Sequence, residues 1–146
     1  SGNWTAASQA SGRRAQRAQL MLVESRTVSD TMSLQVHLTS DVPVYSLEFT
    51  ANFAAANVVA LEPTLTTATQ EWLVSSNRRE PGRIRVAMAS AQPFTGDDSV
   101  LVLQFRPIAG QQEVAVLLQE ARVDEAPIDL PQEMQQIFLP FIAAAR

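Results

Sequence analysis

Hydrophobic and polar positions alternate along most of this chain in short runs. From Leu20 onward, turn-forming residues separate the apolar runs at intervals of roughly 8–12 residues, which is typical of a β-sandwich or β-barrel. In Ser46–Phe53 every second residue is apolar, the period of a strand with one buried face and one face in water. No convincing helical spacing interrupts the region. The pattern predicts an all-β domain with strands near residues 20–26, 31–39, 44–53, 57–61, 70–75, 82–90, 99–107 and 112–123.

The 146 residues suffice for one domain with a single core, and the two ends differ from the middle. Residues 1–19 are small, polar and dotted with arginine, so we expect a disordered linker or a cloning remnant there. Residues 20–130 are expected to form the β-sandwich. Residues 131–146 gather apolar side chains around Pro140, a residue that interrupts helices and central strands. We expect this tail to dock on the sandwich, extend a sheet edge or anchor the protein.

Alternation also assigns side chains to faces. In three of the predicted strands the apolar positions are assigned to the core, and the opposite positions are expected to face outward. The outward residues are Ser46, Glu48, Thr50, Asn52, Arg83, Arg85, Ala87, Val100, Val102 and Gln104. Thr95–Asp98 contains glycine and aspartate, which favour turns, so we predict a turn between the strands at 82–90 and 99–107.

Composition and charge narrow the possible functions. The formal net charge is −4, and all 11 basic residues are arginine. This mild acidity argues against nucleic-acid binding, for which a basic surface is typical. Because cysteine is absent, disulfides and thiol chemistry are excluded. No apolar run reaches the about 18 residues that span a bilayer, and the first residues lack the pattern of a signal peptide. If the protein is exported, we expect its signal to lie outside this sequence.

Catalytic chemistry finds no support in the sequence. His37, the single histidine, is expected to face outward, and no Gly-flanked nucleophile turn or oxyanion-hole sequence accompanies it. The acidic pairs Asp97–Asp98 and Asp124–Glu125 lack the separation and burial that glycosidase carboxylates need. They also lack the spaced ligands of an EF-hand calcium loop. We expect a protein that is not an enzyme and that holds no metal or other cofactor.

Four segments carry a more specific pattern: Val28–Leu38 (VSDTMSLQVHL), Val44–Leu61 (VYSLEFTANFAAANVVAL), Ala91–Phe105 (AQPFTGDDSVLVLQF) and Ala121–Leu130 (ARVDEAPIDL). They follow the order of an opening turn and strand, a strand running into a corner, a turn before an apolar strand, and a last strand with its closing loop. Together they resemble a cohesin domain, the receptor module that binds dockerin domains in cellulosomes and in other bacterial and archaeal surface assemblies. Phe53–Ala55 stands where many cohesins have Tyr-Asp-Pro, which fits a divergent and non-cellulosomal member.

The resemblance implies a nine-stranded jelly-roll β-sandwich of two antiparallel-type sheets that binds a dockerin-type partner as a protein–protein interaction module. Cohesins bind dockerin on the face of their strands eight, three, six and five. We take residues 44–53 as strand three, 82–90 as strand six and 99–107 as strand eight, so the ten outward residues become the expected partner-binding residues. Ser46 and Glu48 fall where the family often has a hydrogen-bonding Asn and Asp pair.

Further expectations follow from the same resemblance. Calcium is expected in the dockerin partner rather than in this chain. We expect a monomer at an extracellular or cell-surface location. Polysaccharide association of the parent protein stays open, as does membership of a cellulosome.

Two other functions stay open as well. Related jelly-roll sandwiches hold glycans on a strip of aromatic side chains, and Trp72 is the one tryptophan in a predicted strand. A single indole makes a poor stacking platform. A structural role as a surface or adhesin domain is also compatible with a sandwich fold.

Overall fold

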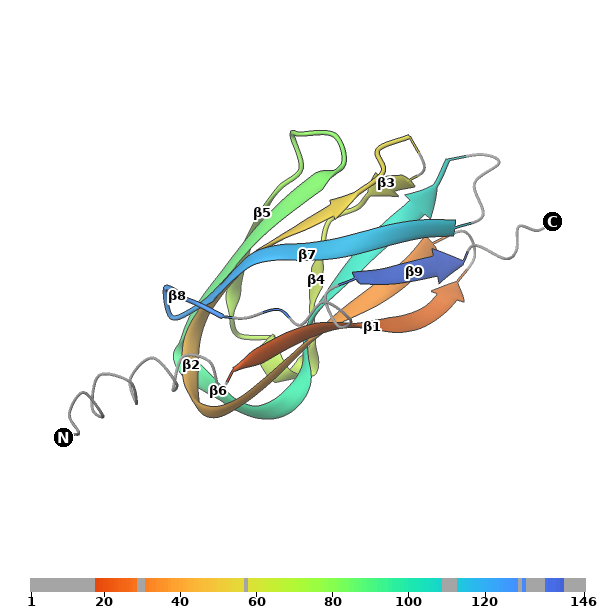
Figure 1. Ribbon diagram of the computed structural model, residues 1–146. Helices are drawn as coiled ribbons and strands as arrows, with labels where there is room; N and C mark the ends of the chain where they lie inside the picture. Colours follow the sequence, from red (N-terminus) through yellow and green to blue (C-terminus); the bar gives the residue numbers. More distant parts are fainter. Residues whose placement is uncertain are drawn as a thin grey trace.

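The computed structural model describes residues 18–28, 31–56, 58–108, 113–128, 130 and 136–140, and these residues form almost only β-structure (Figure 1). They contain nine strands and one short 3-10 helix, η1 (Thr67–Thr69). Two strands are far longer than the others, β2 (Thr31–Phe53) and β6 (Arg83–Pro107). Within this part of the chain, no helix is long and apolar enough to cross a membrane.

The two long strands run antiparallel and bend together. Their register slips between Ser40 and Ser46 on β2, opposite Ala89–Gly96 on β6. Pro43 and Pro93 lie in these stretches, where each lacks the N–H group that a regular ladder uses. Extra residues in such irregularities bend a strand. Each long strand therefore passes from one sheet into the other, through the tight curve at the bottom of Figure 1.

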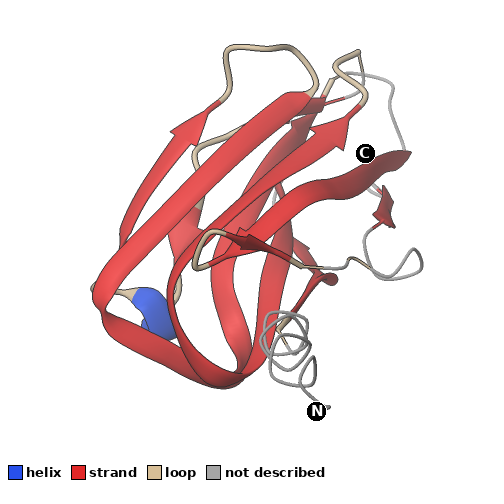
Figure 2. Ribbon diagram, turned by 60° about the vertical axis from the view of Figure 1, so that its left-hand side comes forward, coloured by secondary structure: helices blue, strands red, loops and turns tan. Residues whose placement is uncertain are grey.

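The bend divides the strands into two layers (Figure 2). The first layer joins β1 (Gln19–Val28), residues 31–40 of β2, residues 96–105 of β6, β3 (Val58–Ala60) and β4 (Thr64–Leu65). The second layer joins β5 (Leu73–Asn77), residues 83–89 of β6, residues 46–53 of β2 and β7 (Glu113–Val123). Two further strands, β8 (Ala126–Pro127) and β9 (Gln136–Pro140), pair with β7. Because β9 also lies beside β1, it closes one side of the sandwich.

Alternation fills the space between the layers. Every second side chain of β2 is buried from Met32 to Ser40, and the apolar positions of β6 follow the same rule on both sides of the bend. Phe49 and Phe105 are among the largest fully buried side chains. The ring of Phe53 packs edge-on against Phe105, with centroids 5.3 Å apart. Burial of each such side chain contributes about 1.5–3 kcal/mol. The prediction of an all-β, nine-stranded jelly-roll sandwich with two antiparallel sheets is confirmed.

Two predicted breaks between strands are wrong. The predicted strands at 31–39 and 44–53 form one strand, β2, and those at 82–90 and 99–107 form one strand, β6. The predicted turn at Thr95–Asp98 lies inside β6, where Gly96 has a φ of 114°. Pairing continues through it, with Gly96 opposite Ser40. Turn-forming residues mark the bend, but here they redirect a pair of strands instead of ending it.

Candidate partner-binding face

The outer side of the second layer carries side chains from four strands, and the register aligns them in rows. One row contains Ser75, Ala87, Glu48 and Arg122, and the next contains Asn77, Arg85, Thr50 and Gln119. We call the outer side of β5, residues 83–89 of β6, residues 46–53 of β2 and residues 116–123 of β7 the four-strand face. The alternation that buries the apolar residues of these strands also places the polar residues on this face.

A hollow of about 540 Å³ lies in the middle of the four-strand face. Its lining includes the carboxylates of Glu48 and Glu120 and the guanidinium groups of Arg85 and Arg122. Ala87 is exposed between Ser75 and Glu48, and its short side chain leaves space above the middle of the row. The hollow is therefore suited to a polar surface that presents charges of both signs.

A bulge in β7 sets the position of Glu120. Glu48 pairs with Arg122 and Thr50 with Gln119, so the intervening stretch of β7 is one residue longer than that of β2. Glu120 has a φ of 56°, in the left-handed region that costs a residue with a Cβ atom about 1–2 kcal/mol. Strained backbone of this kind persists where surrounding contacts hold it. Here β7 pairs with β2 on both sides of the bulge, at Gln119 and at Arg122.

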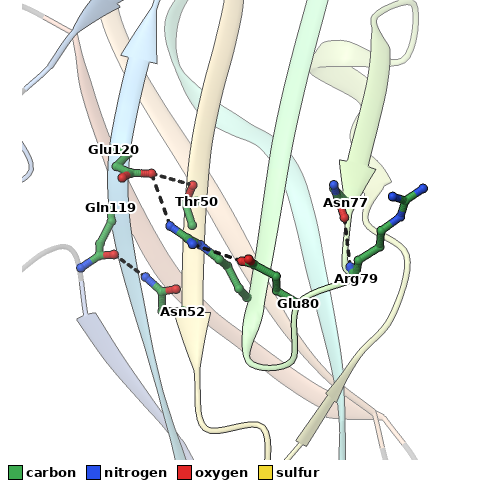
Figure 3. Close-up of polar contacts among 8 residues, drawn as sticks. Thr50, Asn52, Asn77, Arg79, Glu80, Gln119 and Glu120 are labelled. Atoms are coloured by element: carbon green, nitrogen blue, oxygen red, sulfur yellow. Dashed lines mark hydrogen bonds and ion pairs between the residues drawn. The ribbon is translucent and has the colours of Figure 1, made fainter.

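The Glu120 carboxylate belongs to a polar network that fixes Arg83 (Figure 3). The hydroxyl of Thr50 donates a hydrogen bond to Glu120 Oε1 over 3.3 Å. The guanidinium group of Arg83 lies between two carboxylates, with Nη1 3.1 Å from Glu80 Oε1 and Nη2 3.7 Å from Glu120 Oε1. The charge of Arg83 is therefore balanced within the chain.

Three other charged side chains of the face have no opposite charge paired with them among the described residues. Glu48, Arg85 and Arg122 are exposed, and none of them forms an ion pair with another described residue. Glu48 stands beside Arg122 in its row, and Arg85 is in the next row. These are the charges that a binding partner could meet.

Most of the predicted partner-binding residues lie on the four-strand face. Those that are exposed or half-buried there are Ser46, Glu48, Asn52, Arg83, Arg85 and Ala87. Thr50 belongs to the same side of β2 but is only 2% exposed, so the expectation that it faces solvent is wrong. Its hydroxyl is used by Glu120 instead. Asn52 donates its side-chain amide to Gln119 of β7.

The placement of Val100, Val102 and Gln104 on this face is wrong. Val102 pairs with Gln35, and Gln104 pairs with Ser33, so all three lie in the first layer. Val100 is 1% exposed and belongs to the core. The physical reason is the bend, which carries the second half of β6 away from the four-strand face. The place that we assigned to residues 99–107 is occupied by β7.

Sequence reasoning missed the side chains that β5 and β7 contribute, which are Ser75, Asn77, Gln119, Glu120 and Arg122. A signal for the β7 residues exists. The buried positions change from even numbers at Val116 and Leu118 to odd numbers at Ala121 and Val123, as expected for a bulge. The apolar alternation of the sequence breaks at the same point.

The other candidate groups form structural contacts away from the hollow. His37 faces outward from the first layer, as predicted, and Nε2 contacts the carboxylate of Asp97. Thr39 donates a hydrogen bond to the same oxygen over 2.9 Å. The hydrogen bonds from Thr39 and His37 hold the pKa of Asp97 below its usual value of 3.8. Among the described residues, no group of three or more His, Asp or Glu side chains could hold a metal ion.

Asp124 ties the β7–β8 turn to the start of the four-strand face. Its Oδ1 atom accepts hydrogen bonds from the backbone N–H groups of Tyr45 at 2.8 Å and Ser46 at 2.9 Å. Its own N–H group donates to the carbonyl of Ser46 over 3.0 Å. Asp124 and Glu125 both have positive φ, 51° and 70°, as the two central residues of a tight hairpin turn require.

Trp72 is not a surface residue. The strand predicted at 70–75 begins only at Leu73, and Trp72 precedes it with 6% of its surface exposed. Its backbone N–H donates to the carbonyl of Thr69 in η1 over 2.9 Å. The indole is part of the core, so the strand tryptophan considered for glycan stacking is not accessible.

No family model matches the chain, and no curated protein matches it in sequence. Solved structures of cohesins match its fold. A cohesin from Clostridium acetobutylicum superposes with a TM-score of 0.66 at 14% identity, over 92% of this chain and 98% of that one. A non-cellulosomal cohesin from the archaeon Archaeoglobus fulgidus gives 0.60 at 16% identity, over 77% and 84%. The sixth cohesin of scaffoldin B from Acetivibrio cellulolyticus, solved in complex with a dockerin, gives 0.58 at 13% identity, over 77% and 99%. The chain has the cohesin fold in a divergent form.

Proposed function

We propose that this chain is a non-catalytic protein–protein interaction module that binds a dockerin-type partner on the four-strand face. The observation that carries the proposal is a cohesin fold, which a solved neighbour shows in complex with a dockerin, combined with three charged side chains of the face, Glu48, Arg85 and Arg122, that form no ion pair with another described residue. The module is expected to act outside the cell or at the cell surface. Calcium is assigned to the partner.

The charges of the face define what the partner must supply. Removal of a charged group from water is costly unless an opposite charge or a hydrogen-bond partner replaces the water. A partner that covers the hollow therefore presents carboxylate groups toward Arg85 and Arg122 and a hydrogen-bond donor or cation toward Glu48. At Ala87 the partner surface must come close to the sheet, because the alanine side chain is too short to reach a more distant partner.

A carbohydrate-binding role loses its main support, because the indole of Trp72 is buried. The four-strand face offers charged and small polar side chains where a glycan site would need exposed aromatic rings. The remaining alternative is a purely structural surface domain, which would bind no dockerin.

The proposal is tested with a panel of purified dockerin domains of different types, each immobilised in calcium and then in chelator. We expect at least one dockerin to retain the chain in calcium and to release it when calcium is removed. Circular dichroism of the chain with and without chelator is the control, since it shows whether the chelator changes the fold of the chain itself. If no dockerin of the panel retains the folded chain, the proposed function is contradicted.

A further inference from the structure

The outer edge of β5 is open. Among the strands that the structure describes, β5 pairs only with β6, and it forms the rim of the second layer in Figure 1. One side of its backbone therefore presents N–H and C=O groups to which no strand is paired. Natural proteins usually protect such an edge with lysine, proline, a bulge or an inward-pointing charge. The sequence LVSSN of β5 contains no such residue, and its pairing with β6 is regular.

The side chains of β5 also favour a contact with another strand. Leu73 is 78% exposed, more than any other large hydrophobic residue in the described part of the chain. Ser75 and Asn77, which follow on the same side of the strand, are exposed and uncharged. A second strand alongside β5 would cover Leu73 and meet no charge within the strand.

Two copies of β5 can pair with each other without bringing like charges together. When they pair antiparallel around Ser75, Leu73 of each copy lies opposite Asn77 of the other. Antiparallel pairing also brings the turn that precedes β5 in one copy to the end of the contact where the loop that follows β5 in the other copy begins. Glu71 lies in that turn and Arg79 in that loop, and both are exposed. Neither side chain forms an ion pair with another described residue. A two-fold axis would bring these opposite charges together at both ends of the contact.

We propose that the chain forms a two-fold symmetric dimer through antiparallel pairing of β5 with β5 of a second copy, with Glu71 of each copy at the same end of the contact as Arg79 of the other. This proposal replaces the expectation of a monomer and does not depend on the proposed function. The axis of such an edge-to-edge pair is perpendicular to the sheet, so both four-strand faces lie on the same side of one continuous sheet. A binding partner with two modules would engage the dimer more tightly than a single chain.

The experiment is sedimentation velocity of the full chain over a concentration series, with circular dichroism to show that each variant is folded. The wild-type protein is expected to approach twice the mass of one chain as the concentration rises. Leu73→Lys adds the protective residue that natural edges carry, at a position with little burial to lose, and is expected to weaken the dimer by about tenfold. A single-chain mass at every concentration overturns the proposal, as does a dimer that Leu73→Lys leaves unchanged.

The antiparallel direction of the pairing is tested by charge exchange. Glu71→Arg and Arg79→Glu are each expected to weaken the dimer by about tenfold, because two attractive contacts become repulsive. The double variant restores both contacts with reversed sign and is expected to dimerise like the wild type. Glu62→Arg and Arg106→Glu, exposed positions at the first layer, are the matched controls and are expected to change nothing. A double variant that is as weak as the single variants contradicts the proposed pairing.

Discussion

Asp124 holds the turn between β7 and β8 against β2 at the place where β2 enters the four-strand face. Its Oδ1 atom accepts two backbone hydrogen bonds, from Tyr45 and Ser46. Asp124→Ala removes the acceptor of both hydrogen bonds at once and leaves the backbone path of the turn in place. The neighbouring Glu125 supplies a matched control, because it also has positive φ and is exposed. Its side chain makes no hydrogen bond to another described residue.

The expected magnitude follows from the two hydrogen bonds. A hydrogen bond to a charged group contributes about 1.5–3 kcal/mol when it is shielded from water. Asp124 is exposed, so water compensates part of this loss at both N–H groups. We expect Asp124→Ala to lower the free energy of unfolding by about 2 kcal/mol. Glu125→Ala should change it by less than about 0.5 kcal/mol, as is usual for surface positions without a specific contact. Asp124→Asn keeps a neutral acceptor and tolerates positive φ, so an intermediate loss is expected.

Urea unfolding at neutral pH, followed by circular dichroism, measures these differences. If the Asp124 carboxylate holds the turn, Asp124→Ala is the least stable variant, Asp124→Asn is intermediate and Glu125→Ala is close to the wild type. Equal losses for Asp124→Ala and Glu125→Ala would refute it, because the loss would then come from the turn backbone and not from the carboxylate.

Three further perturbations concern the first layer, the core and the second layer in turn. Hydrogen bonds from Thr39 and His37 lower the pKa of Asp97 below 3.8, so the stabilisation by the ionised carboxylate is complete above that pH and is lost as the pH falls through the lowered value. Asp97→Asn is expected to remove this part of the acid dependence of unfolding, and an unchanged acid profile would contradict the contact. Trp72→Ala is expected to cost about 3–5 kcal/mol in urea unfolding, whereas a surface indole would cost almost nothing. Gly82→Ala is expected to cost about 2 kcal/mol, because Gly82 has a φ of 77° and a Cβ atom there would lie 2.6 Å from a carbonyl oxygen of β2; a neutral result would contradict this close approach.

The part of the fold and face that the sequence predicts is the part governed by strict alternation. Apart from the buried Thr50, residues 46–53 and 83–89 have one side toward the core and one side that is exposed or half-buried. Period-two patterning therefore identifies Glu48, Arg85 and Ala87 as outward without any knowledge of the neighbouring strands. The face of a strand is a local property, and local sequence determines it.

The remainder depends on which strands are neighbours, and alternation carries no information about that. Gly96 and the prolines near the bend have the same sequence signature whether a strand ends or turns into the second layer, which is why Val102 was assigned to the wrong sheet. The bulge brings Glu120 to Thr50, 70 positions away in sequence. Ser75 and Asn77 lie in a five-residue strand with little apolar content, so no pattern marks them as part of the face.

Docking of a partner on the four-strand face is tested by calorimetric titration of the chain with a dockerin that retains it in the panel. Ala87→Arg adds a long charged side chain in the middle of a row, and because the position is exposed the variant is expected to fold. Arg106→Glu changes an exposed residue of the first layer and is the control. We predict that Ala87→Arg weakens binding by at least about a hundredfold and that Arg106→Glu leaves it unchanged. Undiminished affinity of Ala87→Arg would contradict the account.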